Sequence, residues 1–161
     1  MRRTWAPRGQ TPVQRCWDRR DRLSVLGAVT LSPQRQRLDL RFSVQEENVR
    51  TEHVVRFLKQ LRYELRRPIV VVLDRLAAHR SAAKQLQREG RTDIRCEWLP
   101  AYAPDLNPVE ALWSYTKHSD LANFLPDDTP DLRRTVYHSL AAQRRRRSLL
   151  RSFFHAAELK L

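Results

Sequence analysis

The sequence has 161 residues, enough for one domain of ordinary size, and its 31 Lys and Arg outnumber its 18 Asp and Glu to give a formal net charge of +13. A charge of this size makes nucleic acid the expected partner. GC-rich coding is an alternative source of the bias, because Arg supplies 27 of the 31 basic residues.

Membrane and disulfide-rich proteins do not fit this sequence. No apolar run approaches the ~18 residues that a membrane helix needs, and no apolar core follows the basic N-terminus as it would in a signal peptide. Cys16 and Cys96 are far apart and share no metal-type spacing with a His pair. We therefore expect a reduced, cytoplasmic protein without a zinc site.

The first half of the sequence predicts an arm, a hairpin and a helix. Residues 1–22 are rich in Arg, Pro and Asp and predict a loop or a poorly formed hairpin arm. Residues 23–31 and 38–44 are rich in β-branched and aliphatic side chains and predict an antiparallel hairpin. Apolar residues then recur at helical spacing over 51–65, which predicts an amphipathic helix that ends before Pro68.

The middle of the sequence alternates between strand and helix patterns. Residues 69–73 are continuously apolar, which is typical of a strand covered on both faces in the parallel part of an α/β sheet. A short helix is predicted over 81–88, a second strand over 94–99 and a further helix from Val109 to about His118. The pattern predicts an α/β fold.

Helices are also predicted at the C-terminal end. Thr129 is a good N-cap followed by Pro130 at the first helical position, and apolar residues follow at helical spacing. The tail is helical and basic, with a run of four arginines over 144–147.

Asp74 directly follows the strand predicted over 69–73. The carboxyl edge of an α/β sheet is where such folds place ligands, so this carboxylate is well sited to bind metal. The alternative is that Asp74 only caps the turn that follows the strand.

Glu110 lies at the start of the helix predicted after the proline-rich loop. Asn107 is suited to cap this helix, Pro108 presets its first residue and Glu110 falls at the third helical position. The alternative to a functional role for Glu110 is a capping box, in which its side chain folds back on the Asn107 amide.

Several short motifs accompany these two acidic residues. They are Ala78-His79-Arg80, Leu99-Pro100, Pro104-Asp105-Leu106-Asn107-Pro108 and the segment from Trp113 to Lys117. The combination resembles the catalytic domain of mariner-like insertion-sequence transposases, which belong to the DDE superfamily. The resemblance runs from about Thr4 to Lys117 and implies a ribonuclease H-like α/β fold, a mixed sheet flanked by helices.

The resemblance also implies a metal site and a reaction. In such enzymes three acidic residues hold two Mg²⁺ or Mn²⁺ ions that promote the cleavage and joining of DNA strands. By position, Asp74 is the second aspartate and Glu110 the third acid, with 35 residues between them. His79, Asn107 and Pro108 are expected to support them, although a histidine at a helix start often serves as a cap or packs locally.

The first catalytic aspartate and the central strand that carries it are expected upstream of Met1. Asp18, Asp21 and Asp39 are the early acidic residues, and none of them matches the family motif. The sequence is therefore predicted to be the downstream part of a transposase, from a truncated gene or a second reading frame. Residues 1–125 are predicted to form a partial catalytic domain and residues 126–161 its basic helical extension.

Basic residues near the site and in the tail are the candidates for DNA contacts. They are Arg75, Arg80, Lys117, Arg144, Arg145, Arg146 and Arg147. Arg75 departs from the family, in which Asn commonly follows the aspartate, and a cation there either contacts phosphate or competes with metal for Asp74. The tail run is equally compatible with a solvated helix face and with phosphate contacts.

Three functions are compatible with this sequence. The first is a transposase fragment with an incomplete metal site and little activity alone. The second is a nonenzymatic, basic DNA-binding remnant, and the third is an enzyme completed in trans by an upstream fragment. We expect the chain to lack the helix-turn-helix region of relatives and therefore to bind DNA mainly nonspecifically. The expected protein partners are a transposase fragment or a second copy of the chain.

Overall fold

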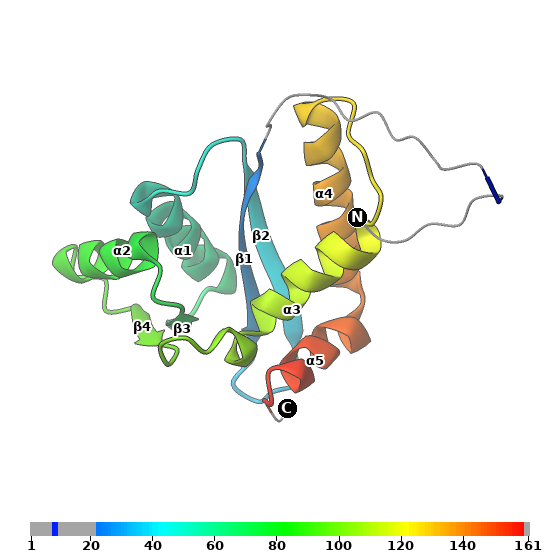
Figure 1. Ribbon diagram of the computed structural model, residues 1–161. Helices are drawn as coiled ribbons and strands as arrows, with labels where there is room; N and C mark the ends of the chain where they lie inside the picture. Colours follow the sequence, from blue (N-terminus) through cyan, green and yellow to red (C-terminus); the bar gives the residue numbers. More distant parts are fainter. Residues whose placement is uncertain (1–7, 10–21, 160–161) are drawn as a thin grey trace.

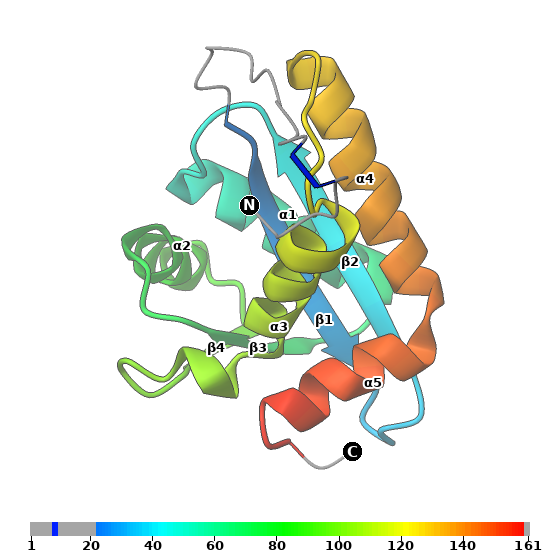
Figure 2. The same ribbon diagram turned by 45° about the vertical axis from the view of Figure 1, so that its right-hand side comes forward.

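The computed structural model describes residues 8–9 and 22–159, and its helices lie on both sides of a central hairpin (Figure 1). In chain order the elements are β1 (Ser24–Leu31), β2 (Leu38–Gln45), α1 (Thr51–Leu65), β3 (Ile69–Leu73), α2 (Ala77–Arg88), β4 (Ile94–Trp98), a 3₁₀ helix η1 (Pro104–Leu106), α3 (Pro108–Tyr115), a π-helical turn η2 (Thr116–Asp120), α4 (Thr129–Arg145) and α5 (Arg147–Ala156). Helices α1 and α2 lie on one side of β1 and β2, whereas α3, α4 and α5 lie on the other (Figures 1 and 2). The α/β class predicted from the sequence is confirmed.

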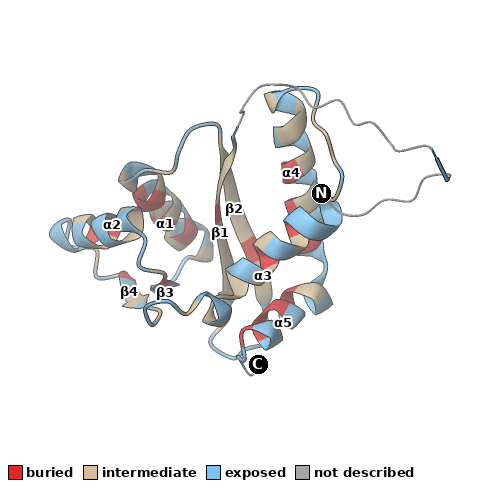
Figure 3. Cartoon of the chain, viewed as in Figure 1, coloured by how far each residue is buried: buried red, intermediate tan, exposed pale blue. Residues whose placement is uncertain are grey.

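The predicted hairpin is confirmed as the antiparallel pair β1–β2, with Leu26 opposite Ser43 and Val29 opposite Leu40. Successive side chains of a strand point to opposite faces, so β1 supplies two cores, whereas the apolar residues of β2 all belong to one. Leu26 packs with α1 and α2, while Val29 and Leu40 pack with α3, α4 and α5. Figure 3 shows the buried positions on the sides of the helices that face these strands.

Two apolar clusters therefore hold the fold together. The first contains Leu26, Val54, Val55, Leu58, Leu61, Ala82, Leu86 and Ile94. The second contains Leu40, Leu112, Val136, Leu140, Leu150 and Phe153. Because α1 carries four residues of the first cluster at helical spacing, the helix predicted over 51–65 is confirmed to the residue.

Strands β3 and β4 form a separate parallel pair, with Ile69 opposite Ile94. The prediction that residues 69–73 are covered on both faces is wrong for one face. Ile69 and Val71 pack against the first cluster, but Val70 and Val72 are 64% and 59% exposed. Both α1 and α2 cover the same face of this pair, and the exposure of the two valines shows that the other face is largely open in the described part of the chain.

The predicted single mixed sheet is found as two separate two-stranded sheets. In residues 22–159, strand hydrogen bonds join β1 only to β2 and β3 only to β4, so β1 and β3 each keep an edge without a strand partner. The strands therefore do not pair continuously in the described part of the chain, and the ribonuclease H-like arrangement stays a prediction.

Several element boundaries differ from the prediction. Helix α2 begins at Ala77, four residues earlier than predicted, so that His79 and Arg80 lie within it. The N-cap of α4 is Asp128 rather than Thr129, because its side chain accepts a hydrogen bond from the Asp131 backbone N–H at 2.7 Å. Most of the arm predicted over 1–22 lies outside the described residues.

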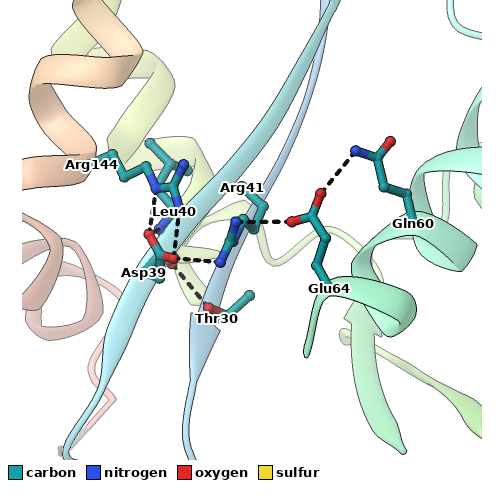
Figure 4. A network of polar contacts seen from close by, with 7 residues as sticks. All are labelled: Thr30, Asp39, Leu40, Arg41, Gln60, Glu64 and Arg144. Atoms are coloured by element: carbon teal, nitrogen blue, oxygen red, sulfur yellow. Dashed lines mark hydrogen bonds and ion pairs between the residues drawn. The ribbon is translucent and has the colours of Figure 1, made fainter. Parts of the chain in front are cut away.

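A polar network joins α4, β2 and α1 (Figure 4). The Arg144 guanidinium donates through Nε and Nη2 to the two carboxylate oxygens of Asp39, at 2.7 and 3.1 Å. Arg41 contacts both Asp39 and Glu64 of α1. Hydrogen bonding to Asp39 raises the pKa of Arg144 above its usual value, so the guanidinium keeps its charge in this network.

None of the helices in the described ranges is long and apolar enough to cross a membrane.

Gly27 of β1 lies directly against the Trp113 side chain of α3. A Cβ at this position would come within 2.8 and 2.9 Å of two ring atoms of Trp113. We expect Gly27→Ala to lower the free energy of unfolding by about 1–3 kcal/mol, measured by urea denaturation, because the core must shift to admit the methyl group. Combining it with Trp113→Leu should cost less than the sum of the two single changes, and strict additivity would contradict the clash.

The Asp39–Arg144 pair should contribute little stability despite its two hydrogen bonds. The two side chains remain 31% and 41% exposed, so we expect Arg144→Gln to lower the free energy of unfolding by about 1 kcal/mol or less. The loss should shrink at about 1 M NaCl, where the charges are screened. The matched control is Arg145→Gln, at the exposed neighbouring position, which should leave thermal unfolding unchanged; an equal loss in both variants would contradict a role for the pair.

Candidate metal and nucleic-acid site

The candidate site is built at the carboxyl edge of the β3–β4 pair. Parallel strands end at the same edge, and here Leu73 lies opposite Trp98. Asp74 follows β3 directly, and the chain leaves β4 through residues 99–107 to reach α3. Arg75 fastens the two strand ends together, because its Nε donates to the Leu99 carbonyl oxygen at 3.2 Å.

One oxygen of Asp74 is held in place by its neighbours. Asp74 Oδ1 accepts a hydrogen bond from the Leu76 backbone N–H at 3.0 Å and another from His79 Nδ1 at 2.5 Å. The capping role considered as the alternative is therefore real. It uses only Oδ1, however, and Oδ2 has no hydrogen-bond partner among the described residues. With its side chain 46% exposed, Asp74 presents this second oxygen to solvent or to a ligand.

Glu110 lies in the first turn of α3 and is not engaged by the cap. Asn107 Oδ1 accepts from the Val109 backbone N–H at 3.1 Å, and Pro108 is the first helical residue, as predicted. The Asn107 backbone N–H donates instead to the Pro104 carbonyl oxygen at 2.9 Å. The amide that a capping box would use is thus occupied, and the exposed Glu110 carboxylate has no partner within residues 22–159.

These oxygens suit a hard divalent cation, because Mg²⁺ and Mn²⁺ prefer carboxylate ligands. They are too few for a complete set, since the described part of the chain contains no group of three or more His, Cys, Asp or Glu placed to hold a metal. Asp39 is bound by Arg144 and Arg41, and Asp18 and Asp21 lie outside the described residues. That Asp74 and Glu110 converge on one metal pair stays a prediction.

The basic candidates differ in how far their charges are already balanced. Arg80 on α2 and Lys117 on η2 are exposed and have no acidic partner among the described residues, and Arg145 and Arg147 are exposed as well. Arg144 is paired with Asp39. Arg146 donates to the Tyr115 hydroxyl at 2.9 Å and lies over its ring.

A groove between α2 and β4 groups further basic residues that the sequence analysis did not single out. Its volume is about 640 Å³, and Lys84, Arg91 and Trp98 line it together with Arg75 and Arg80. The sequence predicts part of this groove, because Arg80 and Lys84 are four residues apart and so share a helix face. That Trp98 also lines it could be found only from the packing of β4 against α2.

Comparisons with known proteins support the resemblance to mariner-like transposases. The structure is similar to a chain in the crystal structure of the Mos1 strand transfer complex, with a TM-score of 0.54 and 16% identity, over 98% of this chain and 49% of that chain. The chain thus spans about half the length of that relative, and the likeness shows the fold. No match was found among curated proteins. Residues 1–133 of the 161 match the family model of the DDE superfamily endonucleases, and the chain therefore belongs to this superfamily.

Proposed function

We propose that this chain supplies Asp74 and Glu110 as two acidic metal ligands of a DDE transposase that cleaves and joins DNA strands. The observation that carries the proposal is a pair of carboxylates with unengaged oxygens, namely Oδ2 of Asp74, which follows β3, and the side chain of Glu110, which opens α3. Asp74 Oδ2 and the exposed Glu110 carboxylate have no partner in the described ranges, so a cation can reach both without displacing an existing contact. Membership of the DDE superfamily supports metal-dependent chemistry on acidic residues, and the assignment of that role to Asp74 and Glu110 is part of the proposal.

In this proposal each neighbouring residue has a positioning role. His79 and the Leu76 N–H hold Asp74 Oδ1, which leaves Oδ2 without a hydrogen-bond partner among the described residues. Asn107 and Pro108 set the start of α3 and thereby the position of Glu110. When bound, Mg²⁺ or Mn²⁺ ions supply the positive charge that favours attack on a DNA phosphodiester and departure of the leaving oxygen.

The charge balance indicates that the site needs a further acid. Two divalent ions carry four positive charges, and Asp74 with Glu110 supply two negative ones. The described residues offer no third ligand, so we propose that the isolated chain holds an incomplete site. Phosphoryl transfer depends almost entirely on positioning and electrostatics, so a missing ligand should prevent catalysis.

Completion in trans is a second candidate function, favoured by the open strand edges. In the described part of the chain β1 and β3 each have one unpaired edge, which is a template for another strand. A transposase segment that brings a strand ending in Asp would add both the pairing and the ligand. A nonenzymatic DNA-binding remnant is the remaining alternative, and the net charge of +13 supports it equally.

Metal binding tests the assignment of the two carboxylates. We expect Mn²⁺ to broaden the amide NMR signals of Asp74 and Glu110 at the same concentration, because one paramagnetic centre would lie near both. Asp74→Asn or Glu110→Gln should each abolish the broadening at both positions. Glu52→Gln, a matched exposed acid in the first turn of α1, should leave it unchanged. Broadening confined to one of the two positions would contradict a shared site.

Cleavage assays test the completeness of the site. We expect the purified chain to leave supercoiled plasmid intact with either Mg²⁺ or Mn²⁺, because the described residues supply no third acidic ligand. Nicking that appears only when an upstream transposase segment is added would support completion in trans. Robust nicking by the chain alone, abolished by both Asp74→Ala and Asp39→Ala, would show that an internal aspartate fills the role and that the site is complete.

A further inference from the structure

The charged side chains that line the groove between α2 and β4 are all positive. Residues of α2 and β4 line it together with Thr92 and Arg75, and its volume is about 640 Å³. Four basic side chains line it, from Arg75, Arg80, Lys84 and Arg91, and no Asp or Glu does. A concave surface of this kind raises the local concentration of anions.

Three of these four charges are left without an acidic partner in the described residues. Arg80 and Lys84 are exposed on α2, about 6 Å apart along the helix axis. Arg75 uses Nε to bind the Leu99 carbonyl and has no carboxylate partner. Arg91 differs, because Asp93 accepts two hydrogen bonds from it and thereby raises its pKa; its charge is largely balanced.

The floor of the groove is apolar and carries an aromatic side chain. Ile94, Cys96 and Trp98 alternate along β4 and line the groove together. Burial raises the pKa of the Cys96 thiol, so this side chain stays neutral. Trp98 remains 38% exposed, which leaves its indole ring available for contact.

We propose that this groove binds a single strand of DNA, with phosphates on Arg75, Arg80 and Lys84 and an unpaired base stacked on Trp98. A basic groove that contains an exposed aromatic ring is the usual arrangement for single-stranded nucleic acid. The volume is that of a small-molecule site and suits a few nucleotides of one strand. A duplex reaches the basic rim only, because its bases are stacked within the helix.

The groove adjoins the candidate metal site through Arg75. This residue lines the groove, directly follows Asp74 and is tied to the end of β4. A strand in the groove would therefore be guided to the carboxyl edge where cleavage is proposed. This guiding role rests on the proposed function, whereas binding in the groove does not require a metal ion.

The test measures binding in EDTA, by fluorescence anisotropy of labelled oligothymidine and of a duplex of equal length. The double variant Arg80→Gln/Lys84→Gln should bind oligothymidine about tenfold more weakly, and its salt slope should fall by about 1.4, or about 0.7 for each lost phosphate contact. The matched control Arg56→Gln/Arg151→Gln removes the same charge from exposed positions on α1 and α5 and should cost about twofold or less. An equal loss in both double variants would overturn the proposal.

Changes at Trp98 separate stacking from charge. Trp98→Ala should weaken oligothymidine binding about fivefold and leave duplex binding unchanged, and Trp98→Phe should restore most of the loss. Circular dichroism checks that each variant is folded. If Trp98→Ala unfolds, the double variant Arg80→Gln/Lys84→Gln still tests whether the groove binds the strand. Equal affinity for single strand and duplex, with no effect of Trp98→Phe or Trp98→Ala, would refute the groove. Because EDTA removes metal, these results are independent of whether Asp74 and Glu110 bind Mn²⁺.

Discussion

The parallel pairing of β3 with β4 is the constraint on which the candidate site and the groove both depend. Pairing Leu73 with Trp98 brings the ends of the two strands to one edge, and Arg75 ties that edge by its bond to Leu99. Asp74 is placed there because it follows β3, and Trp98 because it ends β4. The same pairing sets β4 beside α2, which creates the groove. A change of register would move all of these side chains at once.

Hydrogen bonds to nearby backbone and side-chain donors decide which carboxylate oxygens remain free to bind a metal ion. Asp74 uses one oxygen to close its turn and to bind His79, and it keeps the other. Glu110 is left free because Pro104 accepts the amide of Asn107 and Asn107 caps α3 by itself. Asp39 shows the opposite outcome, since two arginines use both of its oxygens (Figure 4). Whether an acidic residue can bind metal thus depends also on whether neighbouring groups already use its oxygens.

Some of the basic side chains form ion pairs within the fold, whereas others have no acidic partner among the described residues. Arg144 binds Asp39 and so joins α4 to β2, and Arg91 binds Asp93. Arg80 and Lys84 keep unbalanced charge beside an apolar floor, where a phosphate can be bound next to a base. A net charge of +13 is compatible with a polyanion partner, and the ion pairs determine which side chains are left to contact one.

The sequence by itself determined the hairpin, the helix α1, the strand β3 and the Asn107 cap, because these depend on patterns within a few residues. It also determined the superfamily, through motifs that surround Asp74 and Glu110. Only the tertiary structure decided that Val70 and Val72 are exposed, since a continuous apolar run does not say which faces are covered. It alone decided that Asp39 is paired and that Trp98 lines a basic groove, because these outcomes depend on residues that are distant in sequence and meet only when the elements pack.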